Sequence, residues 1–130
     1  MAFAEETLTA ALLGTAAITA AIGTRLAPAG GLQDEALPAI TYQRISTVGN
    51  NHLDGGSTLD VAHMQINSWA VTARAAKQLA DLVRRAIEPL GDPGDPPAIG
   101  TFITEQGADF DIETRSFGVK SDFSIWEERT

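Results

Sequence analysis

The clearest hydrophobic pattern in the sequence runs from Asp60 to Leu90 and changes its period once. From Asp60 to Ala70, apolar and polar side chains alternate, as in a strand that has one buried face. After Thr72, apolar residues recur every three or four positions, as along one face of a helix. Thr72 is a suitable N-cap, and Gly91 is a stop signal behind the last apolar residue. The segment therefore predicts a strand that leads directly into a long amphipathic helix, against which the other elements should pack.

Shorter patterns on both sides of this unit predict the other elements. They are helices at 5–13 and 15–22, an irregular connector at 24–33, strands at 37–47, 99–105 and 117–126, and an acidic turn at 106–115. In chain order the elements read α-β-β-α-β-β. This order predicts an α+β fold in which a four-stranded, mainly antiparallel sheet carries helices packed on one face. No internal repeat divides the chain, so we expect residues 1–130 to form a single domain.

Gly, Asn and Asp are concentrated between the first two long strands, at residues 48–59. Asp54-Gly55 favours a hairpin turn, but the segment is too long and too polar to be only a tight turn. We expect a hairpin arm at about 47–59 that projects from the sheet and contacts a partner. Its candidate contact residues are Asn50, Asn51, Asp54, Gly55 and Gly56.

Charge limits the partners that the protein can have. Nine basic and seventeen acidic residues give a net charge of −8. Non-specific DNA binding depends on basic surfaces, so we expect most of the surface of this protein to repel nucleic acid. The apolar N-terminal stretch follows Glu5 and Glu6 rather than basic residues, which predicts a folded helix and not a signal peptide or a membrane span. The sequence has no cysteine, which excludes disulfides and thiolate metal sites.

Motifs for metal binding and catalysis are weak in this sequence. Asp109, Asp111 and Glu113 alternate as in a calcium loop, but positions 114 and 120 lack the glycine and the glutamate that such a loop needs. The two histidines, His52 and His63, have no further ligands at the spacing of a zinc site. No phosphate-binding loop or serine-nucleophile motif occurs. We therefore expect no cofactor, no bound metal and no enzymatic activity.

The strand at 60–70 carries the strongest candidate for an interface. The face opposite Met64 holds His63, Gln65 and Trp69, and the parity of Trp126 in the last strand places it on the same face. Tryptophan is enriched at protein interfaces, where a large apolar anchor with one polar end is useful. The alternative is that each tryptophan closes one end of the core. The sequence leaves both alternatives open.

Four segments together resemble the tail completion, or tail terminator, proteins of long-tailed bacteriophages and gene-transfer agents. They are LPAITYQRIS at 37–46, LDG at 53–55, MQINSWA at 64–70 and DFSIW at 122–126, with an Ala- and Leu-rich helix after the third. The similarity in kind and order extends from Leu8 to Trp126. The chain departs from the family pattern at Asn67 and Ser68, where Asp and Cys are common, and in the loop at 91–97.

The resemblance implies a small α+β subunit that forms a ring, of six copies in the family, on the head-proximal end of the tail tube. Such a ring ends polymerisation of the tail tube protein and offers a surface to the head–tail connector. It also implies a place in the virion after assembly in the host bacterial cytoplasm. Because DNA passes through the ring, we expect acidic residues at the channel and assign Asp109, Asp111 and Glu113 to it. Another head–tail connector or adaptor is an alternative, as is an enzyme with a small-molecule pocket between sheet and helices.

Overall fold

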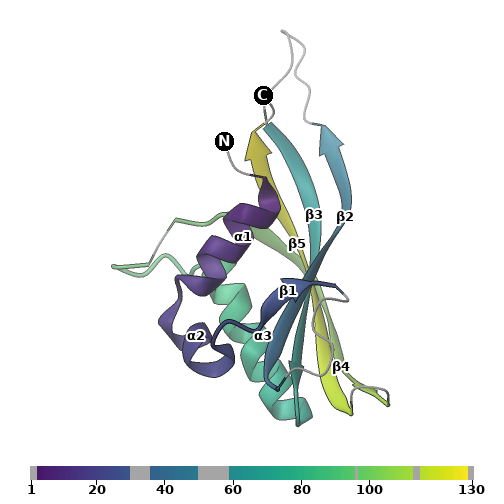
Figure 1. Ribbon diagram of the computed structural model, residues 1–130. Helices are drawn as coiled ribbons and strands as arrows, with labels where there is room; N and C mark the ends of the chain where they lie inside the picture. Colours follow the sequence, from purple (N-terminus) through teal and green to yellow (C-terminus); the bar gives the residue numbers. More distant parts are fainter. Residues whose placement is uncertain (1–2, 30–35, 50–58, 96, 113–114, 129–130) are drawn as a thin grey trace, which may run out of the picture.

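The structure, a computed structural model, describes residues 3–29, 36–49, 59–95, 97–112 and 115–128 (Figure 1). Its helices are α1 (Ala4–Leu13), α2 (Ala16–Ile22) and α3 (Ala73–Ile87), and its strands are β1 (Leu26–Pro28), β2 (Ala39–Gly49), β3 (Leu59–Ala70), β4 (Gly100–Asp111) and β5 (Ser116–Glu128). The predicted order of the main elements is confirmed, including the direct passage from β3 into α3.

The strands form one five-stranded sheet in the order β1-β2-β3-β5-β4. The four long strands are antiparallel to their neighbours, as predicted, whereas β1 pairs in parallel with β2 at Leu26–Pro28. The sequence prediction missed β1, because Pro28 and the glycines behind it are typical of a connector. Pro28 is tolerated here because a proline, which lacks an N–H group, can sit on an edge strand.

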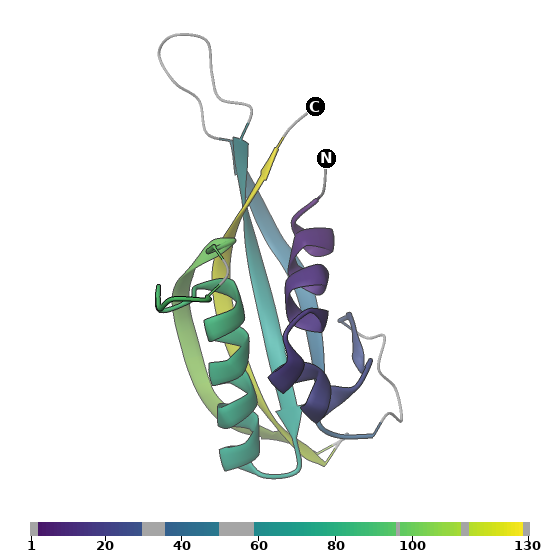
Figure 2. The same cartoon turned by 90° about the vertical axis from the view of Figure 1, so that its left-hand side faces the viewer.

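All three helices cover the same face of the sheet, which we call the inner face (Figure 1). Seen from the helix side, α1 and α3 lie side by side over the strands (Figure 2). Completely buried side chains fill the space between the layers, and the largest are Leu8, Leu12, Ile18, Ile22, Ile40, Met64, Ile66, Ile87, Phe123 and Ile125. Burying an aliphatic or aromatic side chain stabilises a fold by about 1.5–3 kcal/mol, so this layer accounts for most of the stability.

Helix α3 begins as predicted but ends earlier. The Thr72 hydroxyl accepts a hydrogen bond from the Ala75 N–H at 3.1 Å, which confirms the N-cap. The predicted end at Leu90 is wrong, since the helix stops at Ile87 and the Leu90 side chain is 73% exposed. Pro89 explains the difference, because a proline disfavours the helical conformation of the residue before it, and Glu88 has an extended φ of −125°.

Strand β4 is longer than predicted. Asp109 and Asp111 were expected in an acidic turn, but both are paired residues of β4, opposite Gly118 and Ser116. The ladder shifts its register between Gln106 and Asp109, so an irregularity in the strand replaces the turn expected at Gln106. Strand β2 likewise continues to Gly49, into the segment predicted as an arm, whereas residues 50–58 lie outside the described residues.

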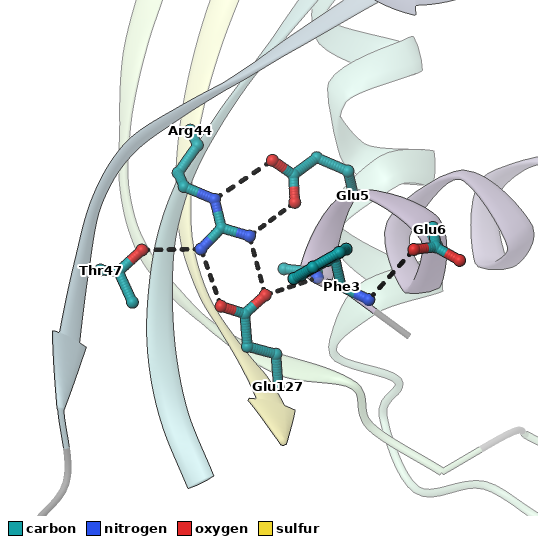
Figure 3. Close-up of polar contacts among 7 residues, drawn as sticks. Phe3, Glu5, Glu6, Arg44, Thr47 and Glu127 are labelled. Atoms are coloured by element: carbon teal, nitrogen blue, oxygen red, sulfur yellow. Dashed lines mark hydrogen bonds and ion pairs between the residues drawn. The ribbon is translucent and has the colours of Figure 1, made fainter. Parts of the chain in front are cut away.

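A partly buried charge network joins the start of α1 to the sheet (Figure 3). The Arg44 guanidinium donates to both oxygens of Glu127, at 2.7 and 2.8 Å, and to both oxygens of Glu5, at 2.6 and 3.1 Å. Glu127 also accepts the first N–H of α1, from Ala4, at 2.9 Å. The hydrogen bonds from Arg44 lower the pKa of the Glu127 carboxyl and, in the same way, that of Glu5. The network joins three elements that are distant in sequence, namely α1, β2 and β5.

This network predicts acid sensitivity. A carboxyl whose pKa is lowered by folding stabilises the folded state above its unfolded pKa of about 4.5, and this contribution is lost as the pH falls through the lower folded pKa. Glu127→Gln should therefore reduce the free energy of unfolding near neutral pH by about 1.5–3 kcal/mol, the range for hydrogen bonds to charged groups. Urea unfolding of both proteins between pH 7 and pH 2 measures the difference. The two curves should converge at the acid end, and a constant difference across this range would contradict the role of Glu127.

Candidate functional site

The second face of the sheet, which we call the outer face, is not covered by any of the described helices (Figure 1). It consists of residues that alternate with the core residues along the four long strands. Those on the three central strands are Thr41, Gln43, Val48, Val61, His63, Gln65, Asn67, Trp69, Gly118, Lys120, Asp122, Ser124 and Trp126. The cross-strand register places Trp69 opposite Gly118 and Trp126 opposite Val61, so both tryptophans lie on this face and neither belongs to the core between sheet and helices.

Trp69 lies flat across the sheet. Its indole N–H donates to the Thr41 hydroxyl of β2 at 3.0 Å. On the other side, a Cβ atom added to Gly118 of β5 would lie only 2.6 Å from the indole Cζ3 atom, so the ring covers the glycine closely. One face of the indole is thus packed on the strand, and the side chain as a whole is half-buried. Sequence analysis found Trp69 but missed Gly118, whose role depends on the pairing of β3 with β5.

A hollow of about 510 Å³ opens beside Trp69. Its lining comes from β4, β5 and the end of β3, and consists of Trp69, Asp109, Phe110, Asp111, Ile112, Gly118 and Lys120. Ile112 is 81% exposed and Phe110 is 52% exposed, so two large apolar side chains of the lining are open to solvent. The sequence analysis assigned Trp69 to an interface and Asp109 and Asp111 to a channel. The structure brings these residues together in one acidic and aromatic hollow, which we call the Trp69 hollow.

The middle of the outer face is polar. The Gln43 amide donates to Gln65 at 3.0 Å, and the Gln65 amide donates to Asp122 at 3.2 Å. His63 Nε2 lies 3.4 Å from the other oxygen of Asp122. His63 and Gln65 were expected on this face, whereas Asp122 becomes visible as their common neighbour only from the strand register. These side chains hold one another in place and present a polar surface of fixed shape.

The end of the outer face at the β2–β3 connection is apolar. Val48, Val61 and Trp126 lie opposite one another on β2, β3 and β5, and we call them the apolar row. Trp126 is 47% exposed and Val48 is 60% exposed. Strand β4 does not reach this row, because its first residue, Gly100, pairs with Ile125. The apolar row is therefore a surface that a partner can cover.

Several predicted site residues cannot be placed. Asn50, Asn51, Asp54, Gly55, Gly56 and Glu113 lie outside the described residues. Within the described ranges, no three His, Asp or Glu side chains come close enough together to hold a metal ion. The helices of this part of the chain are also too short or too polar to span a bilayer. The described outer face thus carries a polar surface, an apolar row and the Trp69 hollow.

Comparison with protein families identifies the chain. Residues 6–128 match the family described as "Tail completion protein gp17". The protein belongs to this family. It is therefore a structural protein of the phage-tail class and a component of the virion, as the sequence resemblance implied.

A solved structure shows the same fold. A chain in the structure titled "Virion of native gene transfer agent (GTA) particle" matches with a TM-score of 0.70 at 17% identity, over 93% of this tail completion protein and 91% of that chain. At this identity the likeness concerns the fold. A search of curated proteins finds no match.

The contact between Trp69 and Gly118 gives a test of the outer face. Gly118→Ala should lift the indole from the strand, cost about 1–3 kcal/mol in unfolding free energy and shift the tryptophan fluorescence. Gly107→Ala is a matched control on β4, because a Cβ atom there meets nothing within 4 Å. If both variants have wild-type stability and fluorescence, the indole is not held against Gly118.

Proposed function

We propose that the protein forms a closed ring on the head-proximal end of a tail tube, where it ends tube polymerisation and presents the surface for head–tail joining. Membership of the tail completion family supports this role. The structure supplies surfaces that fit it, because the outer face carries the apolar row and the Trp69 hollow, whereas the exposed side chains of α3 are mostly charged. A terminating subunit needs such a difference, because one of its surfaces must bind the last ring of the tube while the opposite surface must not bind a further ring.

The observation that carries the proposal is the uncovered outer face with its two tryptophans. A ring is built from heterologous contacts, in which one patch of each copy meets a different patch of the next copy. The outer face and the helical layer lie on opposite sides of the subunit (Figure 1). Packing the outer face of one copy against the helical layer of the next would repeat around a ring and cover Trp126, the apolar row and the Trp69 hollow.

Charge agrees with a conduit for DNA. Each copy has a net charge of −8, so a ring of several copies repels the phosphate backbone and does not hold the duplex. Asp109 and Asp111 lie beside Trp69, which favours a place for them at the contact between copies. The repulsion then comes from the acidic surface as a whole rather than from a dedicated acidic turn.

The first test is removal of the exposed tryptophan. Trp126→Ala should weaken assembly by about 2 kcal/mol or more, the loss expected for a central interface anchor, while changing monomer stability little, because this side chain is half-exposed. Leu90→Ala is the matched control, since Leu90 is a large exposed residue away from the sheet. Ring formation with purified tubes is measured by electron microscopy and sedimentation. Normal rings together with a loss of thermal stability would show that Trp126 serves the fold.

The second test concerns the arm at 47–59. Gly49 and Asp60 pair directly across β2 and β3, so a two-residue Asn-Gly loop can replace residues 50–59 and keep this register. We expect the shortened protein to keep its fold but to leave tubes unterminated or unable to join heads, because the arm supplies contacts to the last tube ring or to the neighbouring copy. Tail length and head joining are measured in an assembly reaction. Tails of normal length that join heads efficiently would show that the arm is a surface loop only.

A further inference from the structure

Arg74 occupies a place that the fold of one copy does not explain. It lies in the first turn of α3, where the positive end of the helix dipole disfavours a cation, and this turn has no acidic residue. Its side chain is exposed. Among the described residues, Arg74 makes no ion pair and no side-chain hydrogen bond. No contact within the described part of the subunit therefore offsets the unfavourable interaction of Arg74 with the helix dipole.

The Trp69 hollow offers what a guanidinium requires. The indole of Trp69 rests with one face on Gly118, so the ring is fixed on the floor of a surface recess. Asp109 and Asp111 lie in the same recess with one cation, Lys120, so the lining carries more negative than positive charge. Asp109 is exposed, and in the described part of the chain it forms no ion pair. A cation that stacks on tryptophan beside a carboxylate gains both a cation–π contact and a charge-assisted hydrogen bond.

The two sites lie at the same level of the subunit but on opposite sides. Trp69 is at the end of β3, and α3 begins shortly after it on the other face of the sheet (Figure 1). An arginine on the helical layer of one copy is thus level with the hollow on the outer face of another copy that packs against it. Arg74 is not among the residues that line the hollow of its own chain.

We propose that Arg74 of each copy docks in the Trp69 hollow of the next copy, on the indole and against Asp109. The inference rests on the proposed ring and names the contact that closes it. The occupant is a second copy of this chain, because the recess holds an indole and two carboxylates against a single lysine, and Arg74 is the basic residue of the helical layer that lacks a partner. The other cations on α3 are already paired, Lys77 with Asp81 and Glu105, Arg84 with Glu88, and Arg85 with Asp92 and Asp95.

Charge exchange between two variants tests the contact. Arg74→Glu and Asp109→Arg should each weaken self-association about tenfold or more, because each puts two like charges at the contact. An equimolar mixture of the two variants should restore it. In an alternating ring, Glu at position 74 meets Arg at position 109, and the native pair forms at every other contact. Native mass spectrometry should then show complexes with equal numbers of both variants.

Stability measurements separate this effect from misfolding. Arg74→Glu places an acid in the first turn of α3, so its melting temperature should stay equal or rise while its assembly falls. Ala98→Glu, at an exposed position before β4, serves as a control for added negative charge and should assemble normally. Because the sequence has no cysteine, a protein with Arg74→Cys and Asp109→Cys should form disulfide-linked multimers on oxidation.

Each outcome is decisive. If the wild-type protein forms no oligomers and the double-cysteine protein forms no disulfide-linked multimers, both the ring and this contact are wrong. If wild type and both charge variants assemble equally, the ring stands and the contact is wrong. If the single variants fail and their mixture also fails, the two positions do not meet, and the inference is overturned.

Discussion

Close packing of the helices against one face of the sheet is the constraint on which the rest of the structure depends. Small residues, among them Ala70, Ala76, Ala80 and Val119, form a buried cluster where α3 meets β3 and β5. They let the helix approach the strands closely, and the large aliphatics of all three described helices fill the rest of the space above the sheet. Because the helices of the described ranges all lie on the inner face, none of them covers the outer face. The Arg44 network joins the first residues of α1 to β2 and β5.

Periodicity predicted the parts of the fold that depend on local sequence. The strand–helix unit, the Thr72 cap and the common face of Trp69 and Trp126 all follow from the alternation of side chains. Contacts between distant strands could not be predicted from the sequence. The alternation of side chains shows which residues share a face of a strand, but not which residues of two strands lie opposite one another. Arg44 and Glu127 are 83 residues apart, and Gly118 has meaning only once it is paired with Trp69. The end of α3, by contrast, has a local signal in the sequence. Pro89 marks it, but the prediction followed the apolar periodicity as far as Leu90.

The candidate site combines residues that the sequence analysis had assigned to different roles. Local sequence predicts an acidic turn at Asp109 and Asp111, yet the register of β4 places both residues beside Trp69, a candidate interface anchor. The family fixes the class of the protein as a tail completion component of the virion. The structure adds a subunit with two unlike sides, which suits a ring whose copies contact one another through different surfaces.

A reconstruction of tails capped by this protein tests the central claim most directly. We expect a closed ring at the head-proximal end of the tube, in which the outer sheet face of each copy is buried against the helical layer of the next. Trp126 and the Trp69 hollow would then be covered by the neighbouring copy. A ring with outer faces open to solvent, or a protein located elsewhere in the particle, would contradict it.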